Sequence, residues 1–257
     1  MKKAMLVQWL MVSCMLFPGI TVRAQDAKVT VAVAANMQYA LKTLKTQFEK
    51  ETGIQVEVIL GSSGKLTQQI QEGAPFDVFI SADTKYPLTL FQNKFATDSP
   101  KVYANGVLVL WSTKSDLKPE VNMQLLLMDK VKKIAIANPK TAPYGVAAVE
   151  ILKRYKLYDK LQKKLVYGES ITQTNQFIMS QSADIGFTAK SAVLSDEMLG
   201  KGTWVEIAHN GYSPIEQAAV LLKHGALNNK ESSEKFYNFL YSKEAKKIYE
   251  RFGYIVK

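Results

Sequence analysis

Cysteine and histidine are almost absent from the 257-residue sequence, which has one cysteine, Cys14, and two histidines, His209 and His224. A lone cysteine cannot form an intramolecular disulfide, so stability must come from a hydrophobic core, which a chain of this length can supply. The histidines lack metal-site spacing and a neighbouring nucleophile, and no serine stands in a G-x-S-x-G elbow. The sequence therefore gives little support to thiol, metal or serine-hydrolase chemistry.

Long hydrophobic runs are also missing, except at the N-terminus. Two lysines precede an apolar run from Ala4 to Phe17, and small residues on either side of Arg23 follow it. The run is shorter than the roughly 20 residues of a membrane-spanning helix, and the whole pattern is typical of a secretory signal peptide. We therefore expect residues 1–24 to be a signal peptide and the protein to be exported. Cys14 loosely fits a lipoprotein processing site, which leaves a lipid-anchored form as the alternative.

Acidic residues are too few to balance the basic ones, and the formal net charge is +10. Such a charge could attract nucleic acid, a membrane surface or small anions. The lysines are scattered, or alternate with acidic residues on amphipathic stretches such as Glu231–Lys247, which is typical of a solvated surface. Together with the expected export, this pattern argues against a nucleic-acid partner.

Predicted strands and helices alternate along the rest of the chain. The predicted strands are Val29–Val33, Val56–Leu60, Phe76–Ser81, Val107–Trp111, Lys133–Ala137, Leu165–Tyr167, Asp184–Thr188 and Gln217–Leu222. The predicted helices lie at about 37–52, 66–71 and 145–155, from about 172 onward, and at 230–241 and 243–252, with Gly53 ending the first of them. Repeated strand–helix units predict an α/β fold with a mainly parallel sheet and helices on both faces.

Four predicted strand-to-helix turns have the composition of anion-binding sites. Ligands of α/β proteins gather beyond the carboxyl ends of strands, where helix N-termini present free N–H groups. The four turns are Ala34–Met37, Gly61–Lys65, Asn138–Gly145 and Gly168–Thr172. The first three also have a purely structural interpretation: Asn36 can be a helix N-cap, the Ser/Gly turn an ordinary turn, and Tyr144 a packed residue.

Two features of the sequence resemble enzyme motifs, but they support an enzymatic function less well than the four turns support anion binding. Gly61–Lys65 lacks the first glycine and the final Ser/Thr of a Walker A loop, so nucleotide binding is poorly supported. Asp77 and Asp83 flank a predicted strand and could form an acid–base pair, although capping and turn roles explain them more simply. An exported phosphoryl hydrolase using these carboxylates is the enzymatic alternative.

The four turns, together with Gly73–Asp83 and Asp184–Phe187, resemble in order and spacing the periplasmic molybdate-binding proteins. These are the substrate-binding components of molybdate ABC transporters. The resemblance extends from Lys28 to the Phe-Gly-Tyr sequence near the C-terminus, and it implies a type II periplasmic-binding-protein fold, two α/β lobes with a ligand cleft between them. It implies a first lobe from 25–105, a second from 106–209 and a return to the first at 210–257.

The resemblance also implies a site of neutral donors. In the family, backbone N–H and hydroxyl groups hold one tetrahedral oxyanion without salt bridges. The matching positions are Asn36, with the backbone of Ala35, and Ser63 in the first lobe, and Tyr144 and Ile171 in the second. The implied ligand is molybdate or tungstate, without a cofactor, a directly bound metal or a catalytic residue. Sulfate or another tetrahedral oxyanion is the alternative.

The resemblance further implies a periplasmic monomer that delivers its ligand to the membrane permease of an ABC transporter. Two positions depart from the common family pattern. Many members have serine where Asn36 stands, so the first-lobe donor here is expected to be an amide. Some members have a tyrosine after the Gly-Phe strand, where Thr188 and Ala189 stand, and Tyr144 is expected to supply the phenol instead.

Overall fold

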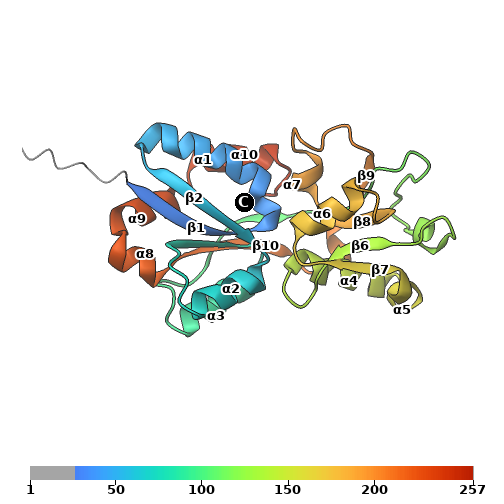
Figure 1. The fold of residues 1–257 in the computed structure, drawn as a ribbon, viewed down its shortest axis with the longest axis horizontal. Helices are drawn as coiled ribbons and strands as arrows, with labels where there is room; N and C mark the ends of the chain where they lie inside the picture. Colours follow the sequence, from blue (N-terminus) through green and yellow to red (C-terminus); the bar gives the residue numbers. More distant parts are fainter. Residues whose placement is uncertain (1–26, 257) are drawn as a thin grey trace, which may run out of the picture.

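The structure is a computed structural model that describes residues 27–256. The expected signal peptide and Cys14 lie outside the described residues. Figure 1 shows two α/β lobes side by side along the long axis of the molecule. Within residues 27–256, no helix is long and apolar enough to cross a lipid bilayer.

The first lobe is built on a five-stranded mixed sheet. In spatial order its strands are β2 (Gln55–Gly61), β1 (Lys28–Ala34), β3 (Val78–Ser81), β10 (Ile215–Leu221) and β4 (Lys101–Gly106). β1 pairs in parallel with β2 and β3, whereas β10 runs antiparallel to β3 and β4. Its helices are α1 (Gln38–Thr52), α2 (Ser63–Gln71), α3 (Lys85–Gln92), α8 (Lys223–Asn228), α9 (Lys230–Phe239) and α10 (Lys243–Arg251).

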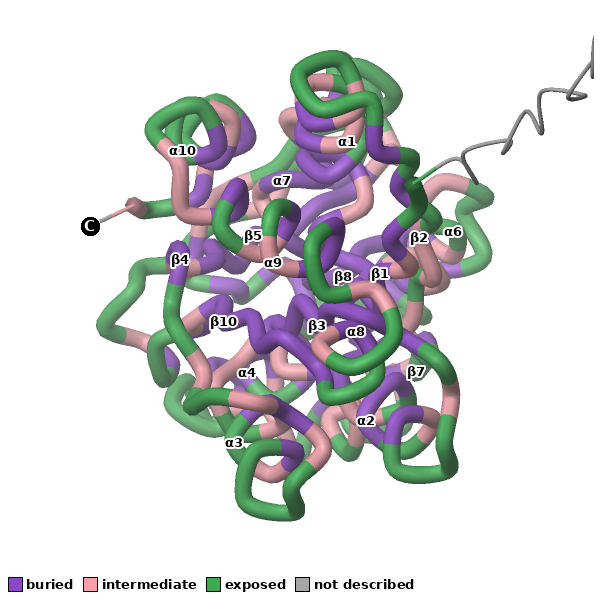
Figure 2. Tube along the Cα trace, turned by 90° about the vertical axis from the view of Figure 1, so that its left-hand side faces the viewer, coloured by how far each residue is buried: buried purple, intermediate pink, exposed green. Residues whose placement is uncertain are grey.

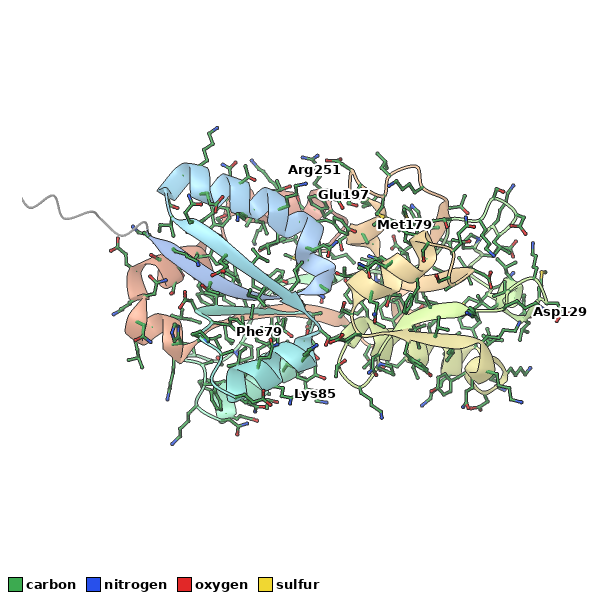
Figure 3. The ribbon with its side chains drawn as sticks, in the orientation of Figure 1. Phe79, Lys85, Asp129, Met179, Glu197 and Arg251 are labelled. Atoms are coloured by element: carbon green, nitrogen blue, oxygen red, sulfur yellow. The ribbon has the colours of Figure 1, made fainter. Side chains whose placement is uncertain are left out.

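Strand alternation divides the core of the first lobe between the two faces of its sheet. Val29, Val31 and Val33 of β1 pack on one face with α1, α9 and α10. Ala32 and Phe79 belong to the cluster on the other face with α2 and α3. Figure 3 shows the Phe79 side chain inside the lobe, and Figure 2 shows the buried residues concentrated in the central strands. Both faces of the sheet are therefore covered, as the sequence predicted.

The second lobe repeats this plan. Its strands, in spatial order, are β7 (Leu165–Gly168), β6 (Ile134–Ala137), β8 (Ile185–Ala189), β5 (Leu108–Ser112) and β9 (Thr203–Glu206). Its helices are α4 (Pro143–Arg154), α5 (Tyr158–Leu161), α6 (Ile171–Met179) and α7 (Lys190–Val193). α4 packs on one face of the sheet, and α6 and α7 pack on the other. Short 3₁₀ turns are η1 (Ala35–Met37), η2 (Gln124–Leu127), η3 (Gln162–Lys164) and η4 (His209–Gly211).

The expectation of a mainly parallel sheet is wrong. In each sheet two strand pairings are parallel and two are antiparallel, because β10 and β5 run against their neighbours. Apolar periodicity predicts a strand but carries no information about its direction. The edge strands β4 and β9 were not predicted, because they begin with exposed residues and lack a buried apolar run.

The chain crosses between the sheets twice. The first crossing is Val107, between β4 and β5, and the second is residues 207–214, between β9 and β10. The lobe boundary expected at 105/106 falls at the end of β4, one residue before the first crossing, and the one expected at 209/210 falls within the second crossing. We keep both as proposed boundaries. The crossings bring turns from both halves of the sequence to the junction of the lobes.

Candidate functional site

The five residues predicted to bind the anion line one small cavity between the lobes. Ala35 and Asn36 lie in η1, and Ser63 is the first residue of α2. Tyr144 and Ile171 begin α4 and α6 on the opposite side. All five are at most 5% exposed. The rest of the lining consists of Ala34, Gly61, Ser62, Ala82, Ala142 and Pro143.

The cavity has room for one small species. Its volume, measured for the centre of a water-sized sphere, is about 10 Å³, which corresponds to a single such sphere. None of the described residues that line it is acidic or basic. Polar groups in the lining are therefore backbone amides, one side-chain amide and hydroxyls.

Four helical segments begin at this cavity, two from each lobe. The first N–H groups of a helix have no acceptor within the helix, and their aligned dipoles carry partial positive charge. Ser63 and Ile171 are the first residues of α2 and α6, Tyr144 is the second residue of α4, and η1 leads into α1. Converging helix N-termini of this kind form a site for an anion.

Three hydroxyl groups border the cavity. The Ser63 hydroxyl oxygen accepts a 3.0 Å hydrogen bond from the Ala82 N–H, so its own proton stays available as a donor. The hydroxyls of Ser62 and Tyr144 are buried and have no hydrogen-bond partner among the described residues. A buried hydroxyl without a partner is destabilising unless a bound group satisfies it. Ser62 lies in the turn Gly61–Lys65 that the sequence predicted to bind an anion, but it was not among the residues assigned to the site.

The phenol of Tyr144 is a neutral group deep in the protein. Burial raises the pKa of Tyr144 well above its usual value, and the neighbouring phenols of Tyr254 and Tyr212 raise it further. The hydroxyl lies against Gly106, where a β-carbon would collide with it. The glycine at the end of β4 therefore leaves space for the Tyr144 side chain between the lobes. The raised pKa means that the phenol keeps its proton.

The side-chain amide of Asn36 was expected to be the first-lobe donor, but in the structure it is already hydrogen-bonded within the protein. Its Nδ2 donates hydrogen bonds to Gln217 Oε1 at 2.7 Å and to the Tyr254 hydroxyl at 3.0 Å. An amide nitrogen has two hydrogens, so both are used inside the protein. The donor that Asn36 can still offer to the cavity is its backbone N–H.

Lys65 does not reach into the cavity. It forms an ion pair with Glu169 across the mouth of the cleft, and both side chains are about half exposed. Three hydrogen bonds also join the lobes around the cavity: Gly64 N–H to Thr141 O at 2.9 Å, Tyr86 hydroxyl to Lys140 O at 3.1 Å and Thr172 hydroxyl to Gln38 Oε1 at 2.6 Å. The two lobes are therefore closed on each other.

The carboxylates considered for acid–base chemistry do not form a pair. Asp77 and Asp83 lie at opposite ends of β3, about 20 Å apart at the usual rise of a strand. Asp77 accepts hydrogen bonds from the Thr30 N–H and the Asn229 side chain and contacts His224. Asp83 accepts from the Ser81 hydroxyl and the Tyr86 N–H, and burial raises its pKa. Both carboxylates have structural partners, and neither lines the cavity.

Two α/β lobes closed over a small cavity of neutral donors define a two-lobe solute-binding protein. Residues 29–255 match the family described as bacterial extracellular solute-binding protein, and the chain belongs to this family. Individual relatives indicate which kind of solute-binding protein this chain resembles.

The chain is 39% identical over 232 residues to the molybdate-binding protein ModA of Azotobacter vinelandii, covering 90% of this chain and 91% of the relative. It is 37% identical over 240 residues to ModA of Rhodobacter capsulatus, covering 93% and 92%. The solved periplasmic molybdate-binding protein of A. vinelandii superposes with a TM-score of 0.84 at 35% identity, covering 89% of this chain and 99% of that chain. The resemblance to molybdate-binding proteins and the two-lobe fold are thereby confirmed.

Proposed function

We propose that this protein captures molybdate, and also tungstate, and delivers it to the membrane permease of an ABC transporter. The observation that carries the proposal is the closed cavity, where helix N-termini from both lobes and three hydroxyls converge without a charged side chain. Relatives that are 37–39% identical are named as molybdate-binding proteins. A fully ionised tetrahedral oxyanion, which accepts hydrogen bonds on every oxygen, matches the chemistry of this cavity.

Each lobe supplies part of the donor set. In the first lobe, we assign the backbone N–H groups of Ala35 and Asn36 and the N–H and hydroxyl of Ser63. Ser62 adds a second hydroxyl beside it. In the second lobe, we assign the N–H groups at the starts of α4 and α6, on Tyr144 and Ile171, and the Tyr144 phenol. An anion that bonds to both lobes stabilises the closed arrangement, because only that arrangement brings all of these donors together.

The donor set also favours one protonation state of the ligand. A fully ionised dianion accepts hydrogen bonds on all of its oxygens. An anion that carries a proton, as phosphate does near neutral pH, needs an acceptor for that proton, and the cavity lining has no carboxylate. A donor facing a donor leaves both unpaired, which costs about 1–3 kcal/mol. Phosphate is therefore expected to bind poorly.

We place this activity outside the cytoplasm, in the periplasm. The N-terminal 24 residues serve as the signal peptide in this proposal, and the protein acts as a monomer that transports its ligand without transforming it. The tetrahedral geometry is common to sulfate, so size within the closed cavity must separate the larger molybdate and tungstate ions from sulfate.

Calorimetric titration of the purified protein tests the proposal. We expect saturable 1:1 binding of molybdate and tungstate, with sulfate and phosphate much weaker. Preferential binding of sulfate would assign the site to a different oxyanion. Turnover of a phosphoester by the pure protein would contradict the proposed transport role.

A further inference from the structure

The anion-binding turn at η1 is connected to the C-terminal end of the chain. The Tyr254 hydroxyl donates to the Asn36 backbone carbonyl at 3.0 Å and accepts from Asn36 Nδ2 at 3.0 Å. These two residues are 218 positions apart in the sequence. A single phenol thus holds both the main chain and the side chain of Asn36.

A second hydroxyl reaches the same turn from the other lobe. Ser191, in α7, donates to the Asn36 carbonyl at 2.8 Å and lies 3.2 Å from the Tyr254 hydroxyl. Ser191 is 2% exposed and Tyr254 is 5% exposed, so neither bond competes with bulk water. Gln217 completes the set by accepting from Asn36 Nδ2.

Tyr254 is itself firmly fixed. The following residue, Ile255, exchanges two backbone hydrogen bonds with Asn105 of β4, at 2.7 and 2.9 Å. The Tyr254 ring lies 6.2 Å from the ring of Tyr249, at an edge-on angle of 71°. Burial raises the pKa of Tyr254, so the phenol keeps the proton that it donates. The C-terminal segment therefore presents this hydroxyl from a rigid support.

We infer that Tyr254 and Ser191 are positioning residues of the anion site. They do not line the cavity. They hold the carbonyl of Asn36, and Tyr254 also holds its side chain, so the backbone dihedral angles of Asn36 are restricted. This restriction orients the adjoining backbone N–H that we assign to the anion. This inference rests on the proposed function and deepens it, because it makes the C-terminal segment and α7 part of the binding machinery. Without the two hydroxyls, the η1 turn gains freedom that the ligand must remove on binding.

Two matched pairs of substitutions test the inference. Tyr254→Phe is compared with Tyr249→Phe, since the Tyr249 hydroxyl is also buried in this region but donates to Leu240 O at 2.8 Å. Ser191→Ala is compared with Ser195→Ala, since the buried Ser195 hydroxyl donates to Ala192 O at 2.7 Å. Within each pair one buried oxygen is lost, and only one member contacts Asn36.

Two quantities are measured for each variant: the melting temperature without ligand and the Kd for molybdate by calorimetry. We expect both members of a pair to lower the melting temperature. Only Tyr254→Phe and Ser191→Ala should weaken molybdate binding, by about three- to tenfold, mainly through faster dissociation. In an Asn36→Ala background, Tyr254→Phe should still weaken molybdate binding, because the backbone carbonyl at position 36 that the phenol holds is retained.

The outcomes separate this inference from the proposed function. If the wild-type protein binds none of the oxyanions, the proposed function fails. If it binds molybdate but Tyr254→Phe and Ser191→Ala match their controls in Kd, the positioning role is overturned and the contacts are only structural. Should Tyr254→Phe fail to fold, the Ser191 and Ser195 pair decides the question alone.

Discussion

The two halves of the cavity are constructed differently. In the second lobe, both donor helices begin with local features: Pro143 starts α4, and Ser170 caps α6 by accepting from the Gln173 N–H. In the first lobe, the turn at Asn36 is held by residues far away in the sequence, such as Tyr254. The helix starts of the second lobe are therefore set by local sequence, whereas the position of the Asn36 turn depends on the packing of distant parts of the chain. Substitutions in each lobe test this difference.

The largest effect is expected for Ser63→Ala in the first lobe. It removes a donor to the anion and also the oxygen that pairs with the Ala82 N–H. Loss of a hydrogen bond to a charged group costs about 1.5–3 kcal/mol, so molybdate affinity should fall roughly ten- to a hundredfold. Calorimetry measures the Kd, and an unchanged circular dichroism spectrum shows that the fold is retained. An unaltered Kd would remove Ser63 from the site.

Tyr144→Phe in the second lobe should weaken binding by roughly tenfold. Ser63→Ala should also lower the melting temperature of the free protein, because the Ala82 N–H loses its acceptor, but Tyr144→Phe should not. The Tyr144 hydroxyl has no partner among the described residues, so its removal should leave the melting temperature without ligand unchanged or raised. Ile171→Val is the control, since it keeps the backbone N–H. A Tyr144→Phe protein that binds normally would show that the phenol does not contact the anion.

Ser62→Ala sharpens the comparison within the first lobe. Ser62 resembles Tyr144 in having a buried hydroxyl without a partner among the described residues. We expect several-fold weaker molybdate binding and no loss of stability in the free protein. Parallel thermal melts with and without molybdate measure both quantities. Equal stabilisation of wild type and variant by saturating ligand would contradict the assignment.

Lys65→Ala should have a small effect, below about threefold in Kd. The Lys65–Glu169 pair joins the lobes at the exposed mouth of the cleft, and exposed pairs contribute about 0–1 kcal/mol and are screened by salt. Glu169→Ala should match it, and 0.5 M salt should reduce both effects. Abolished binding in Lys65→Ala would mean that charge, rather than neutral donors, holds the anion.

The smallest change is expected with pH, where affinity should be nearly flat from about pH 6 to 9. Burial raises the pKa of Tyr144, so the phenol is a neutral donor below that raised value and is lost only under more alkaline conditions. His209 contacts Glu206, His224 contacts Asp77, and neither histidine lines the cavity. A Kd that rises steeply around pH 6.5 would show that a histidine takes part.

The sequence located the donor turns because each one is a local feature. Small residues, serines, glycines and prolines at the starts of helices identified the segments around Asn36, Ser63, Tyr144 and Ile171, and these segments meet at one cavity. The positions of eight strands and of the helices α1, α2, α4, α6, α9 and α10 were also predictable from apolar periodicity, whereas α3, α5, α7 and α8 were not predicted. Strand direction was not predictable. The edge strands β4 and β9 were also missed, because they begin with exposed residues, whereas the opposite edge strands β2 and β7 were predicted.

What the sequence by itself determined is therefore the set of helix N-termini and hydroxyls that can face an anion. The tertiary structure alone decided how each group is used. In the folded chain both amide hydrogens of Asn36 bond to Gln217 and Tyr254, and Lys65 pairs with Glu169. Among residues 27–256, the hydroxyls of Ser62 and Tyr144 have no hydrogen-bond partner. The physical reason is that a turn is set by a few adjacent residues, whereas a hydrogen-bond partner is set by which groups the folded chain brings within 3 Å or so.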